Sequence, residues 1–191
     1  MAKQFWKPGN MLYPLPAVLI SCGEYGKEVN AFTASWTGTI CTNPAMVYIS
    51  VRPERYSYHM IKESGEFVIN LSTSQMTKAV DYCGVRSGRN EDKLKKNGLT
   101  CQAGNKVKAP IIEQSPVNIE CKVREIKELG SHHMFIADVV GVDIDEQFMD
   151  KRGKFHLNQS DLLVYSHGEY YNLGKLKGTF GYSVKKKGKG R

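Results

Sequence analysis

Short apolar segments rich in β-branched residues recur along this chain, and glycine or proline interrupts each of them before a long helix can form. A turn at 23–26 follows the first segment and leads into a second that runs from Val29 to Trp36, which predicts a β-hairpin. Residues 134–144 are long, apolar and β-branched, and we expect them to form a central strand. Further strands are expected at residues 17–22, 46–51, 66–71, 119–123 and 162–165.

Helical patterns in the sequence are short. A helix that contains Tyr58 is expected to end at Gly65, and a second is expected to begin after a Ser/Thr cap at 72–74 and to end at Gly84. A further short helix is expected at 91–96. Strands therefore outnumber helices, and no β-α-β-α alternation is present. We predict a mainly β fold, an antiparallel β-barrel with α-helical inserts.

Length and composition favour one globular domain. The chain has 191 residues, of which 41% are hydrophobic and 24% charged, an ordinary balance for such a domain. We expect a single domain at 1–184 and a basic flexible tail at 185–191. No apolar run approaches the roughly 20 residues of a membrane helix. The N-terminus lacks the apolar core of a signal peptide, so a cytoplasmic protein is expected.

Cysteine usage and charge argue against several other classes of protein. The chain has five cysteines and no C-x-x-C motif, which predicts reduced thiols that pack as small hydrophobic groups and no metal site. The net charge of +8 comes partly from the C-terminal tail. Because no RNP, zinc-finger or helix-turn-helix signature accompanies it, we do not expect nucleic-acid binding. A basic surface suits an anionic small molecule or an acidic redox protein instead.

The segment from Asn30 to Trp36 alternates in a way that a strand would divide between two faces. The face that we expect to pack carries Asn30, Phe32, Ala34 and Trp36. The other face carries Ala31, Thr33, Ser35 and Thr37. These small groups and hydroxyls can approach a flat heteroaromatic ligand and hydrogen-bond its edge. Taken alone, the segment fits an ordinary amphipathic strand better.

The segment 50–57 (SVRPERYS) ends one strand and leads through Pro53 into the first expected helix. Arg52, Arg55 and Ser57 stand at the helix start, where free backbone N–H groups and the positive end of the helix dipole favour an anion. Surface charges and a helix cap are the alternative interpretation. A ring site beside a phosphate site indicates a nucleotide-like cofactor.

Two further motifs complete an ordered set, Ser87-Gly88-Arg89 with Asp92-Lys93, and Gly130-Ser131-His132. With the two segments above, they resemble the flavin reductase-like, FMN-binding split-barrel family, most nearly its flavoredoxin group, from about Pro14 to about Tyr182. Ser131 departs from the Gly-Asp-His common in that family and removes a carboxylate. The resemblance implies an FMN-binding split barrel of antiparallel Greek-key type. It also implies a homodimer with each FMN near the subunit interface.

The resemblance assigns candidate cofactor-binding residues. Contacts to the flavin ring are expected from Asn30, Ala31, Thr33, Ser35, Trp36 and Tyr165. Contacts toward the phosphate end are expected from Ser50, Arg52, Arg55, Tyr56, Ser57, Arg89 and Lys93. His132, the catalytic candidate, is expected near the flavin and the nicotinamide, where it would hydrogen-bond a carbonyl or assist protonation. A solvated basic turn, a structural histidine and barrel packing of Tyr165 are the alternatives.

No P-loop, G-x-G-x-x-G, H-E-x-x-H or Ser-His-Asp spacing is present, so a pyridine nucleotide would have to stack on the flavin in an open groove. The function we expect is that of an NAD(P)H:flavin oxidoreductase using FMN. The first alternative is a flavoredoxin-like electron carrier that keeps FMN bound and exchanges electrons with a redox protein. The second is a non-catalytic flavin-binding module. A flavin-free β-barrel binding protein is the interpretation that remains without the resemblance.

Overall fold

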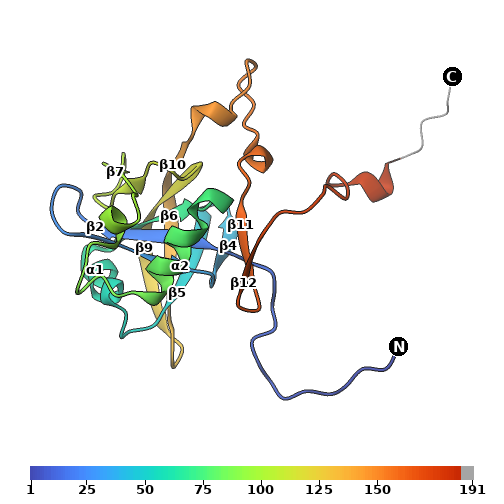
Figure 1. The fold of residues 1–191 in the computed structure, drawn as a ribbon, viewed down its shortest axis with the longest axis horizontal. Helices are drawn as coiled ribbons and strands as arrows, with labels where there is room; N and C mark the ends of the chain where they lie inside the picture. The colour runs from blue at the N-terminus through green and yellow to red at the C-terminus, as the bar shows by residue number, and fades with distance from the viewer. Residues whose placement is uncertain (186–191) are drawn as a thin grey trace.

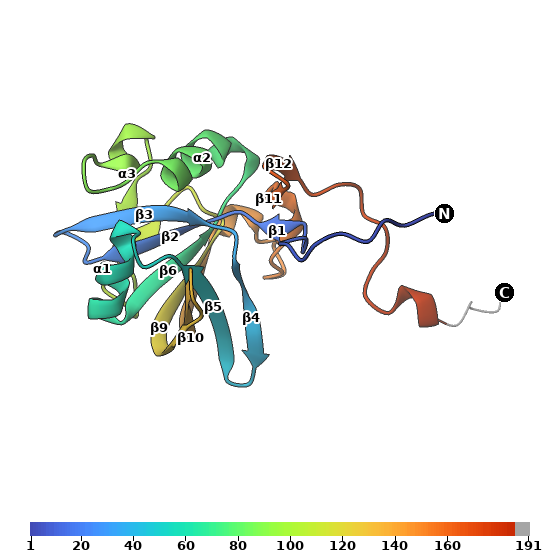
Figure 2. The ribbon, with the colours of Figure 1, turned by 90° about the horizontal axis from the view of Figure 1, so that it is seen from below.

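A curved antiparallel sheet forms the body of the molecule (Figures 1 and 2). The computed structural model describes residues 1–185, and within them seven strands form this sheet. Their order is β3 (Val29–Ala34), β2 (Val18–Gly23), β6 (Glu66–Leu71), β9 (Val117–Glu128), β10 (His133–Ile144), β5 (Ala45–Val51) and β4 (Thr37–Thr42). The Ser50 amide donates to the Trp36 carbonyl at 2.8 Å, which links β5 to the segment that follows β3. The sheet thereby curls into a barrel, and the predicted mainly β, antiparallel fold is confirmed.

Smaller elements decorate the barrel. β1 (Leu15–Pro16), β11 (Leu163–Ser166) and β12 (Glu169–Asn172) form one small sheet, and β7 (Cys101–Gln102) pairs with β8 (Ile111–Ile112). Short 3₁₀ turns are η1 (Ser74–Met76), η2 (Glu146–Phe148), η3 (Leu157–Gln159) and η4 (Tyr182–Val184). The β11–β12 hairpin lies next to the start of β2, where the Leu163 carbonyl accepts a hydrogen bond from the Ala17 amide.

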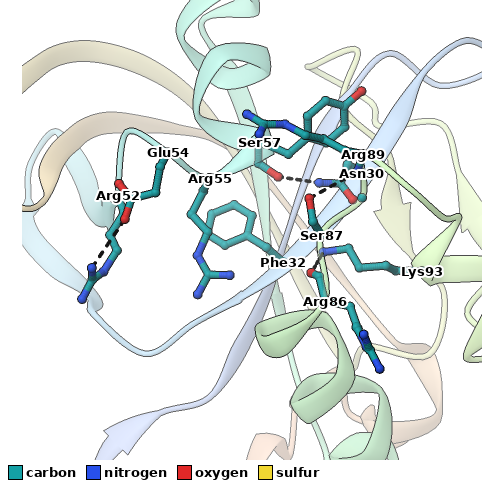
Figure 3. Close-up of a pocket in the computed structure, with 12 residues that line it drawn as sticks. Asn30, Phe32, Arg52, Glu54, Arg55, Ser57, Arg86, Ser87, Arg89 and Lys93 are labelled. Carbon is teal, nitrogen blue, oxygen red and sulfur yellow. Dashed lines mark hydrogen bonds and ion pairs between the residues drawn. The ribbon is translucent and has the colours of Figure 1, made fainter.

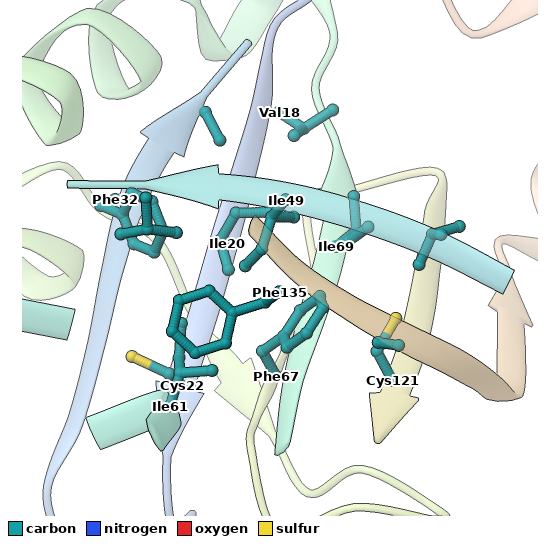
Figure 4. Packing of buried hydrophobic residues seen from close by; sticks show 14 of the residues in the cluster. Val18, Ile20, Cys22, Phe32, Ile49, Ile61, Phe67, Ile69, Cys121 and Phe135 are labelled. Carbon is teal, nitrogen blue, oxygen red and sulfur yellow. The ribbon is translucent and has the colours of Figure 1, made fainter. Parts of the chain in front are cut away.

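The barrel interior is filled mainly by aliphatic and aromatic side chains from β2, β3, β5, β6, β9 and β10, and helix α1 (Tyr56–Ser64) adds two more (Figure 4). Phe67 on β6 and Phe135 on β10 are fully buried beside Ile20 and Ile49. Each large apolar side chain buried in this way stabilises the fold by about 1.5–3 kcal/mol. All five cysteines are free thiols, and burial raises the pKa of Cys22 and Cys121 to about 12, which keeps both protonated.

Among residues 1–185, three α-helices lie outside the barrel: α1 (Tyr56–Ser64), α2 (Thr77–Val85) and α3 (Lys93–Lys96). α1 ends as predicted, at Gly65 with φ +68°. α2 differs from prediction, since it has no side-chain cap at its start and continues one residue beyond Gly84. Gly84 serves packing instead, because a Cβ there would lie 3.3 Å from Cβ of Thr33 on β3. α3 is shorter than predicted, and Asp92 caps it by accepting from the Lys95 amide.

The described residues before β1 and after β12 extend away from the barrel on the same side (Figures 1 and 2). The N-terminal arm (1–14) and the C-terminal arm (173–185) expose large apolar side chains, among them Phe5, Trp6, Leu176 and Phe180. Apart from Lys185, the predicted basic tail lies outside the described residues. In the part of the chain that the structure describes, no helix is both long and apolar enough to cross a membrane.

Candidate functional site

Two adjoining cavities lie where β3 and β5 end beside α1 and α2. The first, of about 460 Å³, has five basic side chains in its lining and is called here the basic cavity. The second, of about 390 Å³, is lined by aromatic and hydroxyl side chains and is called the aromatic cavity. Phe32, Arg52 and Arg55 line both, so the two cavities are neighbours that share part of their walls. Each volume falls within the range of roughly 300–1,000 Å³ typical of small-molecule sites.

The basic cavity is built against the N-terminus of α1 (Figure 3). Ser57, in the first turn of that helix, is buried and accepts a hydrogen bond from Asn30 Nδ2 at 2.7 Å. The loop after α2 approaches Asn30 so closely that a Cβ on Gly88 would lie 2.2 Å from Asn30 Oδ1. The N-terminus of α1, with its free N–H groups and positive dipole end, therefore borders a cavity in which Asn30 and Ser57 are held in place. Its basic side chains are Arg52, Arg55, Arg86, Arg89 and Lys93.

Two of these cations also bind the C-terminal end of α2. The Lys93 ammonium donates to the carbonyls of Cys83 at 3.2 Å and Arg86 at 3.1 Å, and Arg55 donates to the Gly84 carbonyl at 3.0 Å. The side chain of Lys93 is buried, and burial lowers its pKa, partly offset by neighbouring Cys83. Since an ammonium has three protons, one donor of Lys93 remains for a ligand.

The other basic side chains are held more loosely. The Arg89 guanidinium lies 5.8 Å from the ring centroid of Tyr56, whose hydroxyl donates to Glu28. Arg52 forms an exposed ion pair with Glu54 at 3.4 Å. Such an exposed pair is weak, because water screens it, so Arg52 is free to bind an anion instead.

The aromatic cavity carries Trp36 and His132 along one wall. Their ring centroids are 4.4 Å apart, and Ser131 Oγ lies 3.0 Å from His132 Nδ1. Partial burial, together with the charges of Arg52 and Arg55, lowers the pKa of His132. The imidazole is therefore neutral at pH 7, and it offers one donor and one acceptor to the cavity.

The opposite wall comes from α2 and the β11–β12 hairpin. Tyr165 and Tyr170 are paired across that hairpin, with ring centroids 5.7 Å apart. The Tyr170 hydroxyl donates to Asp81 Oδ1 on α2 at 3.3 Å. Burial, and then the charge of Asp81, raise the pKa of Tyr170 to about 12, so its phenol keeps its proton.

The structure brings nearly all of the predicted site residues to these cavities. The basic cavity is lined by the predicted residues Asn30, Arg52, Arg55, Tyr56, Ser57, Arg89 and Lys93. The aromatic cavity is lined by the predicted residues Thr33, Ser35, Trp36, Ser50, Arg52, Arg55, His132 and Tyr165. Their contacts to a cofactor stay predictions.

The predicted division of β3 into a packing face and a ligand face needs correction. Ala31 is fully buried in the hydrophobic cluster beneath α2 and lines neither cavity. The hydroxyl of Thr33 donates to the Val80 carbonyl of α2, although Thr33 also lines the aromatic cavity. Phe32, expected to belong to the core alone, lines both cavities. The reason is that α2 covers the face of β3 that the sequence pattern left open.

Several lining residues were not predicted. Arg86 follows α2 directly and stands next to the Ser87-Gly88-Arg89 motif, which was the available signal. Asp81 and Tyr170 are 89 positions apart and meet through folding, so the sequence gives no local signal for them.

Comparisons with known proteins identify sequences and folds similar to this chain. The sequence model of the flavin reductase-like domain family matches residues 11–174. The structure resembles the flavoredoxin of Desulfovibrio vulgaris (Miyazaki F), with 30% identity, a TM-score of 0.88, and coverage of 96% of this chain and 100% of that one. It also resembles a flavoredoxin from Methanosarcina acetivorans, with 28% identity, a TM-score of 0.85 and the same coverages. An uncharacterized protein of Archaeoglobus fulgidus is 33% identical over 160 residues, 84% of this chain and 88% of that protein.

Proposed function

The chain belongs to the flavin reductase-like domain family, a family of flavoproteins, and from this premise we propose that it binds FMN and works as an NAD(P)H:flavin oxidoreductase. The observation that carries the proposal is that the basic and aromatic cavities adjoin and share Phe32, Arg52 and Arg55 in their linings. A phosphate-bearing flat ring needs such a pair of compartments, one cationic and one lined by rings and hydroxyls.

The donor set of the basic cavity fits a phosphate. The N-terminus of α1 offers backbone N–H groups, Arg89 offers a planar fork, and Lys93 offers its remaining ammonium proton. Gly88 leaves room at the point where any side chain would collide with Asn30. These residues bind and orient the phosphate end of the cofactor.

The aromatic cavity would hold the flavin ring, with Trp36, Tyr165 and the hydroxyls of Ser35 and Ser50 within the lining. Bound FMN supplies the chemistry of two-electron uptake from a hydride donor and release to an acceptor. The neutral His132 holds a donor at the cavity wall, where it would hydrogen-bond a carbonyl or deliver a proton. The protein's further contribution is proximity of the two rings.

An anaerobic visible spectrum of the FMN-reconstituted protein tests this proposal, recorded before and after adding NADH and then NADPH. We expect bound flavin that bleaches within seconds with at least one nucleotide. Bound flavin that remains oxidised until dithionite is added would reject the reductase. Absence of bound flavin after reconstitution would reject the FMN site itself.

A flavoredoxin-like electron carrier is the second candidate, and the two flavoredoxin structures favour it because they match almost the whole chain. The carrier would keep FMN bound and exchange electrons with a redox protein, and Ser131 in place of an acidic residue suits slower nucleotide use. It predicts slow bleaching by both nucleotides and fast reduction by a reduced iron–sulfur or flavin protein. A flavin-binding module without turnover predicts bound flavin that neither the nucleotides nor a redox protein reduces at a competent rate.

We further propose that the protein acts as a homodimer. The exposed apolar side chains of both arms support this assignment, since a second copy would bury them. The electron donor or acceptor is NAD(P)H or a redox protein, as the two candidate functions require.

A further inference from the structure

Asp81 places a carboxylate in a cavity whose other charged lining groups are arginines. It stands on α2 and lines the aromatic cavity together with Arg52 and Arg55. Within residues 1–185, no lysine, arginine or histidine forms an ion pair with Asp81. Its contact is the hydroxyl of Tyr170 at 3.3 Å. A carboxylate that shares a cavity with cations without pairing with them is available to a ligand.

The Asp81–Tyr170 pair presents hydrogen-bond acceptors. Because the phenol proton is donated to Asp81, the free positions on the Tyr170 oxygen are its lone pairs. The Asp81 carboxylate has about four lone-pair sites, of which Tyr170 occupies one. The raised pKa of Tyr170 keeps this arrangement intact through neutral pH. A matching ligand group must donate N–H.

Arg52, a cation in the lining of the same cavity, completes the pattern. Arg52 lines both cavities, its side chain is 53% exposed, and the side chain of its partner Glu54 is 66% exposed. A ligand that suits both ends has an amide N–H at one end and a phosphate at the other. A reduced nicotinamide nucleotide has this distribution, with its carboxamide on the ring and its phosphates beyond the ribose.

We propose that Asp81 and Tyr170 bind the carboxamide N–H of the nicotinamide ring and orient it within the aromatic cavity, while Arg52 binds a phosphate of the same nucleotide. The inference rests on the proposed function and deepens it, because it assigns the residues that select the hydride donor. Asp81 and Tyr170 are positioning residues, and neither needs to gain or lose a proton in the reaction.

The test uses FMN-loaded protein, the variants Asp81→Ala and Tyr170→Phe, and Tyr171→Phe as the matched control. Tyr171 is the neighbouring tyrosine on β12, is 49% exposed, and binds Glu169 outside the cavity. Each protein is reduced by NADH and by its 3-acetylpyridine analogue, which replaces the carboxamide nitrogen with a methyl group. Comparing the ratio of the two rates between variants cancels the intrinsic reactivity of the analogue.

We expect wild type and Tyr171→Phe to favour NADH over the analogue by about ten- to a hundred-fold in kcat/KM, as sites that bind a substrate N–H do. Asp81→Ala and Tyr170→Phe should lose most of this preference, chiefly through KM for NADH. The Kd for FMN, measured by fluorescence quenching, should change less than threefold. Unchanged preference in both variants would overturn the inference. A loss of FMN affinity as large as the loss of NADH preference would also overturn it, because Asp81 and Tyr170 would then bind the flavin ring itself.

A separate binding measurement distinguishes this inference from the proposed reductase function. Oxidised NAD(P) is titrated into the FMN-loaded proteins and followed by the flavin difference spectrum. Wild type that binds the nucleotide but is not bleached by NAD(P)H would reject the reductase and keep the inference, provided that Asp81→Ala weakens binding at least fivefold. Equal binding by all variants, or no binding by wild type, would overturn the inference.

Discussion

Lys93 shows how one side chain serves both the fold and the site. Its ammonium binds two carbonyls at the C-terminal end of α2, where the helix dipole favours a cation. The same group lines the basic cavity, so the charge that stabilises the helix end also contributes to the field that a phosphate meets. The sequence motif identified Lys93 as a phosphate ligand but did not indicate its role at α2.

Replacing Lys93 should therefore have two effects. We expect Lys93→Ala to weaken FMN binding by about 1–3 kcal/mol, the value of a charge-assisted hydrogen bond, and to lower Tm because two carbonyls lose their donor. Fluorescence titration gives the affinity and calorimetry gives Tm. Lys95→Ala is the control, because Lys95 is exposed on the same helix and lines neither cavity. Unchanged FMN affinity in Lys93→Ala would remove Lys93 from the site.

Local sequence patterns predicted the site residues that flank the ends of strands and helices. They failed for residues whose position depends on contacts between distant segments. Arg52, Arg55 and Ser57 follow from a strand end and a helix start, both visible in sequence. Ala31 was misplaced because period-two alternation cannot show that a helix covers the second face of a strand. Asp81 could not be predicted, since its partner comes from a hairpin far along the chain.

At the scale of elements, the sequence predicted the bounds of strands and helices where apolar residues mark them. β6 has the predicted bounds, and α1 ends at the predicted glycine. β4 was missed, because its sequence TGTICT is polar, contains glycine and lies mostly exposed at the sheet edge. Edge strands bury little surface, so their apolar signal is weak.

The loop between α2 and α3 is positioned by one close contact, which makes it a sensitive test of the basic cavity. Gly88→Ala would place a Cβ 2.2 Å from Asn30 Oδ1 and force Asn30 away from Ser57. We expect the Kd for FMN to rise about tenfold or more, equivalent to roughly 1.4 kcal/mol. Gly174→Ala is the control, because nothing lies within 4 Å of its added Cβ. Equal FMN affinity in both variants would show that Asn30 and the loop do not shape the cofactor site.

At the scale of the whole molecule, pH should act on stability through Asp143 on β10. Burial, and then the charge of Glu120 on β9, raise the pKa of Asp143 above its ordinary value. Glu120 is fully buried and accepts three backbone N–H bonds from residues 105–107, so its charge is fixed in place. A carboxyl with a raised pKa stabilises the fold at low pH and loses that contribution as pH rises through the raised value.

Asp143→Asn should remove the cost in folding free energy of holding a charged Asp143 beside Glu120 at neutral pH. Asparagine keeps an oxygen for the Asn105 amide, which now lies 2.6 Å from Asp143 Oδ1, and it offers Glu120 an N–H. We expect Tm at pH 7 to rise by a few degrees and the gain to vanish toward pH 4, measured by calorimetry across pH. Asp138→Asn on the same strand should give no gain, because Asp138 is paired with Arg124 at 2.7 Å. A gain independent of pH would contradict the assignment.

The two terminal arms expose apolar surface that a stable monomer would bury, so we expect them to form a subunit interface. Phe180 and Leu176 are 107% and 80% exposed, and burying each against a second copy is worth about 1.5–3 kcal/mol. We expect sedimentation equilibrium to give twice the 21.5 kDa chain mass, and the double variant Leu176→Asp, Phe180→Asp to shift the protein toward monomer. Tyr25→Asp, in the β2–β3 turn on the opposite side of the barrel, should stay dimeric (Figure 2). A monomeric wild type would reject the dimer, and a fully dimeric double variant would show that the C-terminal arm does not form the interface.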